Sequence, residues 1–150
     1  EFRRVLFRSD ECGASSKAMI EAYTEAGLKP EDITYINAHG TSTHLNDMLE
    51  TKAVKIALGE EQARKVKINS TKSMTGHMLG GTGAVEAAVC ALSIRDSFIH
   101  QTIGYTTPDP ECDLDYCVDG PVEMPVNAAL SNSLGFGGHN ATLCFKKCTD

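Results

Sequence analysis

The longest apolar pattern in the chain runs over residues 79–94. It opens with small residues and continues with Val, Ala, Cys, Leu and Ile on nearly every face of a helical projection. A helix that is apolar all round is typical of a buried helix, and this one is too short to span a bilayer. Glu86 is its only charge and needs a buried partner, for which Lys72 is the nearest candidate.

The rest of the chain divides into shorter helical and strand patterns. Apolar residues at helical spacing predict helices at 14–26 and 46–58, each followed by a glycine that favours a left-handed stop. The second helix is expected to be capped by Asn46 and Asp47. Its inward-facing residues are expected to be Leu49, Ala53, Ile56 and Ala57. Runs rich in β-branched and aromatic residues predict strands at 33–38, 66–69, 99–103, 116–118, 128–132 and 141–145.

Strands and helices alternate along the first two thirds of the chain, which indicates an α/β fold with a parallel sheet. In such sheets, functional sites gather at the carboxyl ends of the strands. His39 follows the strand expected at 33–38, and Lys72 follows the strand expected at 66–69. We therefore expect these two side chains to lie at the same edge of the sheet.

The loop at 133–140 joins the last two strands into a hairpin and carries three glycines around one aromatic residue, Phe136. One interpretation is a flexible turn. The other is a loop whose glycines adopt conformations that direct backbone N–H groups at a developing anion. The second interpretation explains better why a large apolar ring is placed at this tip.

The residues alone leave a structural interpretation open for the polar groups of the central stretch, 68–86. Lys72 and Glu86 can form a structural ion pair, and His77 can be a core histidine with satisfied hydrogen bonds. A zinc site made by His39, His77 and cysteines is disfavoured, because no ligand pair has the usual close spacing.

Composition narrows the class of protein further. The chain has 150 residues, enough for one domain with a core of its own, and we expect residues 10–150 to form it. Residues 1–9 contain three arginines and share no pattern with the rest of the chain, so we interpret them as a foreign or disordered leader. The formal net charge of −6 argues against a nucleic-acid surface. With no apolar run of membrane length, no secretory signal and six cysteines expected as free thiols, the sequence indicates a cytoplasmic location.

Three motifs occur in a fixed order, and together they resemble the C-terminal half of the β-ketoacyl-acyl-carrier-protein synthase II family. They are Asn-Ala-His-Gly-Thr-Ser-Thr at 37–43, Ser-Thr-Lys-Ser-Met-Thr-Gly-His at 70–77 and Asn-Ser-Leu-Gly-Phe-Gly-Gly at 132–138. The resemblance covers about residues 12–147. The sequence of the second motif is more similar to the motif of stand-alone fatty-acid synthase enzymes than to that of modular polyketide synthases.

The resemblance implies a thiolase-like αβαβα fold, of which this chain would be the C-terminal half, with a mixed, mostly parallel five-stranded sheet and a buried central helix. It also implies a homodimer and an N-terminal half that holds the nucleophilic cysteine. None of the six cysteines here lies in that context, so the chain alone is expected to be inactive. The implied reaction is a decarboxylative Claisen condensation between an acyl thioester and malonyl-carrier protein. The implied partners are acyl carrier proteins bearing acyl and malonyl groups, with no cofactor, metal, nucleic acid or membrane.

The resemblance also assigns roles to individual residues. His39 and His77 would donate N–H groups to the enolate oxygen, and Lys72, held by Glu86, would orient and polarise the histidine site. The residues assigned to the gate between the acyl and malonyl pockets and to the oxyanion hole are Phe136, Gly135 and Gly137. The residues assigned to substrate binding are Thr41, Thr43 and Asn132.

Two alternatives and three departures accompany this assignment. The chain can be a polyketide-type ketosynthase, or a chain-length-factor-like subunit of the same fold that lacks catalysis. A metal-binding module is a third, weaker possibility.

His44 stands where many relatives have proline, Leu134 replaces a common phenylalanine and His139 a common threonine. For His44, His100 and His139, surface positions are expected rather than catalytic ones.

Overall fold

A computed structural model of the chain describes residues 12–135 and 137–148. The expected leader at 1–9 and the gate residue Phe136 lie outside the described residues. The helices are α1 Gly13–Glu25, α2 His44–Leu58, α3 Glu60–Ala63, α4 Lys72–Thr75 and α5 Thr82–Asp96, with 3₁₀ turns η1 Pro30–Asp32 and η2 Leu79–Gly81. The strands are β1 Tyr35–Asn37, β2 Lys67–Asn69, β3 Phe98–Ile99, β4 Val122–Glu123, β5 Ala128–Gly135 and β6 His139–Lys146.

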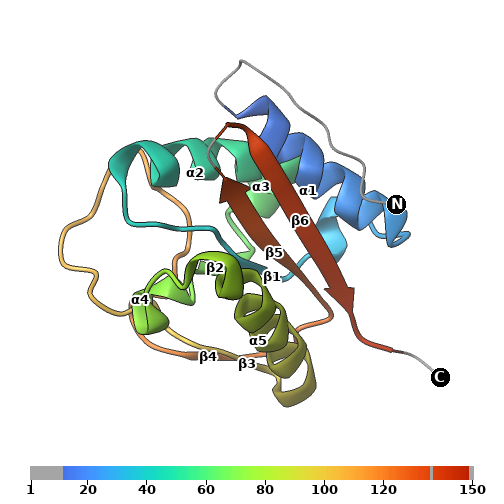
Figure 1. Ribbon diagram of the computed structural model, residues 1–150. Helices are drawn as coiled ribbons and strands as arrows, with labels where there is room; N and C mark the ends of the chain where they lie inside the picture. Colours follow the sequence, from blue (N-terminus) through green and yellow to red (C-terminus); the bar gives the residue numbers. More distant parts are fainter. Residues whose placement is uncertain (1–11, 136, 149–150) are drawn as a thin grey trace.

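Four strands form the central sheet in the order β2-β1-β5-β6 (Figure 1). β1 pairs in parallel with both β2 and β5, and β6 pairs antiparallel with β5. The sheet is therefore mixed and mostly parallel, as expected. The expected hairpin is also confirmed, with arms that extend three residues further toward the tip in β5 and two in β6 than the apolar runs indicated.

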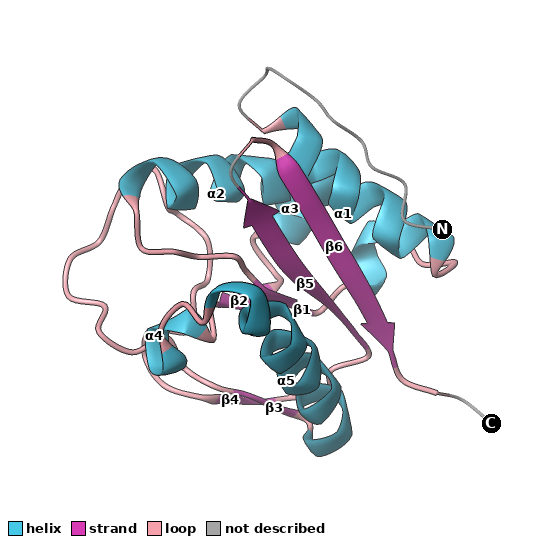
Figure 2. Ribbon diagram, viewed as in Figure 1, coloured by secondary structure: helices cyan, strands magenta, loops and turns pink. Residues whose placement is uncertain are grey.

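Helices cover both faces of this sheet (Figure 2), because consecutive strand residues point to opposite sides. Ile36 of β1 and Leu130 of β5 pack with Met19 of α1 and Val54 of α2 in one core. The neighbouring residues Tyr35 and Ala129 pack on the other side with Cys90 of α5. The result is a helix, sheet and helix sandwich in which α1 and α2 share one face and α5 covers the other.

The expected number of strands in the sheet is wrong, since the described residues form a sheet of four strands rather than five. Of the run at 99–103, only Ile99 is in a strand, and β3 pairs with β4 in a separate two-stranded sheet. No strand forms at 116–118, where Cys117 has a positive φ of 52° that breaks the extended conformation. The chain there still runs beside β2, with Ile68 N–H donating to the carbonyl of Asp115 at 2.9 Å.

The helices form close to where the pattern placed them, with differences at their starts and faces. α2 begins at His44, two residues before the expected cap, and its N-cap residue Thr43 makes no side-chain capping bond. Ile56 is 59% exposed rather than inward-facing. The inward position one turn before Ala53 is taken instead by Glu50, which is 4% exposed.

One face of α5 packs against the sheet, and the rest of this apolar helix is left uncovered in this chain. Residues 79–81 form a 3₁₀ turn, and the buried residues of α5 are Thr82, Glu86, Cys90 and Ser93, which occupy a single face. Val85 and Leu92, to one side of that face, are exposed. No helix in the described part of the chain is long and apolar enough to cross a membrane.

Candidate active site

The two candidate histidines meet at the carboxyl edge of the parallel strands. His39 follows β1, and β1 pairs with β2, which leads into α4 and the left-handed Gly76 that turns the chain back to His77. The ring centroids of His39 and His77 lie 5.6 Å apart, and the rings are nearly perpendicular at 84°. The expected convergence of the two rings is therefore confirmed.

A buried carboxylate fixes the backbone at His39. Oε1 of Glu50 accepts the N–H of His39 at 2.8 Å, and Oε2 accepts the N–H of Gly40 at 2.9 Å. Gly40 has a φ of +44°, and a Cβ at this position would lie 2.5 Å from the Cβ of Ser70. Glycine is thus required by both conformation and space, and the backbone that carries His39 is held rigidly.

Sequence reasoning missed Glu50. Burial raises the pKa of Glu50, while the two backbone N–H bonds and the side chain of Asn132 oppose that rise. The signal that could have found it is periodicity: Glu50 lies three residues before Ala53 and seven before Ala57, on the expected inward face of the helix. A charged residue in an inward register requires hydrogen-bond donors, and β1 ends next to it.

His39 is held in its neutral form. Burial, followed by the positive charge of Lys72 and by His77, lowers the pKa of His39 to about 4. A neutral imidazole keeps one N–H donor, which can bind a developing oxyanion. Lys72 thus influences His39 through its charge.

The hydrogen bonds around His77 define its tautomer. The backbone N–H of Leu79 donates to Nδ1 of His77 at 3.1 Å, and the hydroxyl of Thr82 lies 3.4 Å from the same atom. A backbone N–H can only donate, so Nδ1 carries no proton, and the proton of the neutral ring is on Nε2. The free Nε2–H is the donor that the site offers.

Lys72 and Glu86 form the expected ion pair. Nζ of Lys72 lies 2.5 Å from Oε1 of Glu86, and both side chains are buried. Burial raises the pKa of Glu86, against the effect of the Lys72 hydrogen bond and charge. Oε2 of Glu86 has no hydrogen-bond partner within residues 12–135 and 137–148. The carboxylate of Glu86 thus fixes the ammonium group of Lys72, and the ammonium group is its hydrogen-bond donor.

The other residues predicted for the site lie in the hairpin and in the loop after β1. Gly135 ends β5, and Gly137 has a φ of +80°, so both flank the tip of the hairpin. The hydroxyls of Thr41 and Thr43 lie 2.9 Å apart and are exposed. Asn132 is buried, and its amide is used within the fold. It donates to Oε1 of Glu50 at 3.1 Å and accepts from the hydroxyl of Thr142 at 2.8 Å. Its role in substrate binding stays a prediction.

The histidines expected at the surface differ in environment. His44 is exposed, and its ring lies between Asp109 at 3.2 Å and Glu111 at 3.5 Å, each carboxylate facing a different ring nitrogen. This is the geometry of a surface ion pair. His139 is exposed as expected, whereas His100 is half-buried and bonded on both ring nitrogens.

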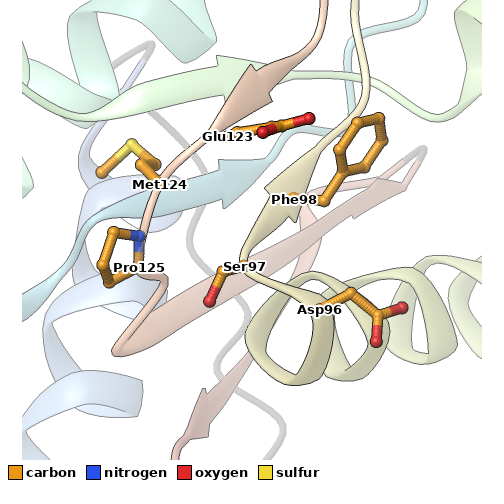
Figure 3. A pocket seen from close by; sticks show the side chains of 6 residues that line it. All are labelled: Asp96, Ser97, Phe98, Glu123, Met124 and Pro125. Carbon is orange, nitrogen blue, oxygen red and sulfur yellow. The ribbon is translucent and has the colours of Figure 1, made fainter.

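A separate hollow of about 470 Å³ lies where α5 ends and β3 begins (Figure 3). It is lined by Asp96, Ser97, Phe98, Glu123, Met124 and Pro125. None of the candidate site residues contributes to it.

Two histidines and a buried lysine lie at the carboxyl edge of a mostly parallel sheet, an arrangement of donors that can stabilise an oxyanion. The fold is that of ketosynthases. One chain of a complex between a type II polyketide synthase acyl-carrier protein and its ketosynthase matches with a TM-score of 0.83 and 40% identity over 91% of this chain and 34% of its own length. The ishigamide ketosynthase/chain length factor matches with a TM-score of 0.84 and 34% identity over 90% of this chain and 33% of its own.

Residues 3–106 match the family described as Beta-ketoacyl synthase, C-terminal domain, and the chain belongs to this family. It is 54% identical over 132 residues to 3-oxoacyl-[acyl-carrier-protein] synthase 2 of Staphylococcus aureus (strain COL), a match that covers 88% of this chain. The resemblance drawn from the three motifs is therefore confirmed. The chain spans 32% of the length of that relative.

Proposed function

We propose that this chain is the C-terminal part of a 3-oxoacyl-acyl-carrier-protein synthase that extends fatty acyl chains by decarboxylative condensation. The observation that supports this most strongly is the pair of neutral imidazoles, His39 and His77, whose rings lie 5.6 Å apart. Two N–H donors at one point suit an oxygen that becomes negative during the reaction. The identity to synthases named for this activity supports the same substrate class.

In the proposed reaction, a cysteine from the rest of the protein carries the acyl group as a thioester. The malonyl thioester binds with its carbonyl oxygen between His39 and His77. Loss of CO₂ leaves the electron pair of the broken C–C bond on an enolate, whose oxygen accepts the two N–H donors. The enolate carbon then attacks the acyl thioester, a new C–C bond forms, and the cysteine leaves as thiolate.

Lys72 serves this reaction through charge and position. Its ammonium group, held by Glu86 at 2.5 Å, contributes to the lowered pKa of His39. A protonated His39 would gain a second N–H but would place a positive ring beside Lys72, so the neutral form is the one that the site stabilises. We infer that Lys72 and Glu86 are positioning residues for the two histidines.

The acyl carrier protein is the proposed partner, because a ketosynthase similar to this chain is known in complex with one. A homodimer, an N-terminal half of the same protein and a cytoplasmic location belong to the same proposal. The alternative with the same fold is a chain-length factor, which the similarity to a ketosynthase/chain length factor structure supports. Such a subunit has no physical need for two oxyanion donors, so the proximity of His39 and His77 favours the enzyme.

The test uses the full-length protein that carries this chain, called the complete synthase below. His77→Ala should lower malonyl-carrier-protein decarboxylation by roughly 100- to 1,000-fold, the usual effect of losing one oxyanion donor. Lys65→Ala, which removes an exposed side chain paired with Glu61 and outside the candidate site, serves as a measure of nonspecific effects. Decarboxylation by His77→Ala at the parent rate would show that His77 is structural, and a parent protein with no condensing activity would favour the chain-length factor.

A further inference from the structure

The segment after β3, residues 100–103, runs beside the turn that carries Lys72 and is bonded to it. The side-chain amide of Asn69 donates to the carbonyl of His100 at 2.5 Å. The backbone N–H of Ile103 donates to the hydroxyl of Ser73 at 3.3 Å. Ile99, just before the segment, is fully buried, so its start is anchored in the core.

The ring of His100 is oriented by a backbone carbonyl. Its Nδ1 lies 2.9 Å from the carbonyl oxygen of Gln101, and because a carbonyl only accepts, Nδ1 carries the proton. In the neutral ring Nε2 is then an acceptor. It lies 3.2 Å from the hydroxyl of Thr71, which donates to it.

Thr71 in turn joins the two strand ends that carry the site. Its hydroxyl oxygen accepts the side-chain amide N–H of Asn37 at 2.6 Å, and its backbone N–H donates to the amide oxygen of Asn37 at 3.3 Å. Asn37 is the last residue of β1, two before His39, and Thr71 directly precedes Lys72. Thr71 is buried, so its hydroxyl proton needs an acceptor, and among the described residues Nε2 of His100 is in position to accept it.

We propose that His100 is a positioning residue for this site. Nε2 of His100 accepts the hydroxyl proton of Thr71, which orients the hydroxyl oxygen so that its lone pair points toward the Asn37 amide. The hydrogen bond between Asn37 and Thr71 then holds the segments that carry His39 and Lys72 in register. Without that acceptor, the Thr71 hydroxyl must turn toward another partner, and the hydrogen bond from the Asn37 amide to the hydroxyl oxygen is weakened. The role rests on the proposed function, because it is defined by the reaction that His39 and Lys72 serve.

The test compares three variants of the complete synthase. His100→Leu removes the acceptor at similar size, and we expect it to lower kcat for malonyl decarboxylation about tenfold with KM within about twofold, since small displacements of catalytic groups reduce rate more than binding. His100→Gln offers an oxygen that can reach Thr71 and should restore most of the rate. Thr102→Val removes a different bond of the same segment, from the Thr102 hydroxyl to the carbonyl of Tyr116, and should stay at the parent rate.

NMR of the His100 ring does not depend on activity, so it tests the contact between His100 and Thr71 separately from the proposed function. The ¹⁵N chemical shifts of the His100 ring should show the Nδ1–H tautomer, and Thr71→Val should shift the Nε2 signal. Thr71→Val and His100→Leu should also be non-additive in rate, because each removes the same bond. If the parent protein proves inactive, the proposed function fails, and the ring signals alone decide the contact between His100 and Thr71.

Several results would overturn the proposal. They are an Nε2–H tautomer, a Nε2 signal that ignores Thr71→Val, a parent rate in His100→Leu, or an equal loss in Thr102→Val. If His100→Leu does not fold, the decision falls to His100→Gln, which must keep the parent rate, and Thr71→Val, which must lose it.

Discussion

Glu50 is the residue whose replacement should report most directly on how the site is held. Three N–H donors reach its carboxylate within 3.1 Å: the backbone of His39 and Gly40, and the side chain of Asn132. Oε1 receives two of them and Oε2 receives the N–H of Gly40. In Glu50→Gln, the amide oxygen can serve the first pair, but the amide NH₂ then faces the N–H of Gly40.

The magnitude follows from that mismatch. Glu50→Gln removes the hydrogen bond from the Gly40 N–H to a charged oxygen, of roughly 1.5–3 kcal/mol, and the longer one from the Asn46 amide at 3.4 Å. It leaves a partly buried backbone N–H without its acceptor, so we expect a loss of about 2–4 kcal/mol in unfolding free energy. That is a large share of the roughly 5–15 kcal/mol that stabilises a domain. Because Gly40 follows His39 directly, the imidazole should shift, and a displacement near 1 Å reduces rate by about 100-fold.

The assay measures Tm and malonyl decarboxylation on the complete synthase and its variants. We expect Glu50→Gln to lower Tm and to lower kcat by about 10- to 100-fold with little change in KM. Glu111→Gln is the matched control, since the same chemical change there affects only exposed pairs with His44 and Lys52. Parent values of both Tm and kcat in Glu50→Gln would refute the assignment of Glu50 to holding His39.

Two further predictions concern pH and the exposed face of α5. The NMR titration of His39 should have its midpoint near 4, whereas in the unfolded chain this histidine binds its proton at about 6.5. The free energy of unfolding should therefore fall as pH drops from about 6.5 toward 4, by about 1–2 kcal/mol after discounting for partial exposure. A midpoint near 6.5 would contradict the proposed environment of His39. The 150-residue chain alone should bind a hydrophobic dye through Leu79, 80% exposed, in the turn before α5, and Leu92, 45% exposed, in α5. Leu92→Asp should reduce this dye binding and should destabilise the complete synthase. If the isolated parent chain binds no dye, the surface around Leu79 and Leu92 is not an interface.

The sequence predicted the parts of the fold that depend on local periodicity. The helix at 14–26, the strand that ends before His39 and the hairpin at the C-terminal end all have the pattern and the stop residues that their structures require. Strand 99–103 failed because its apolar run satisfies a buried position at Ile99 only, after which the backbone bonds to side chains near Lys72 instead of to another strand. Periodicity carries no information about such side-chain partners.

The same division explains what could be predicted of the site. Glu86, Lys72 and His39 were noticed because a charge in an apolar helix and polar groups after strands are anomalies that the sequence itself displays. Their roles, and that of His77, came from the resemblance of the three motifs, since the residues alone left a structural interpretation open.

Glu50 was missed because a glutamate in an amphipathic helix is ordinary until its register is compared with that of its neighbours. The tautomer of His77 could not be predicted at all, since it depends on one N–H, that of Leu79, in a turn whose geometry no pattern specifies. The sequence displays which groups are costly to bury. Which donors meet those groups is decided by the packing of α2 and α4 against the strand ends, and the Glu50→Gln experiment tests one such contact directly.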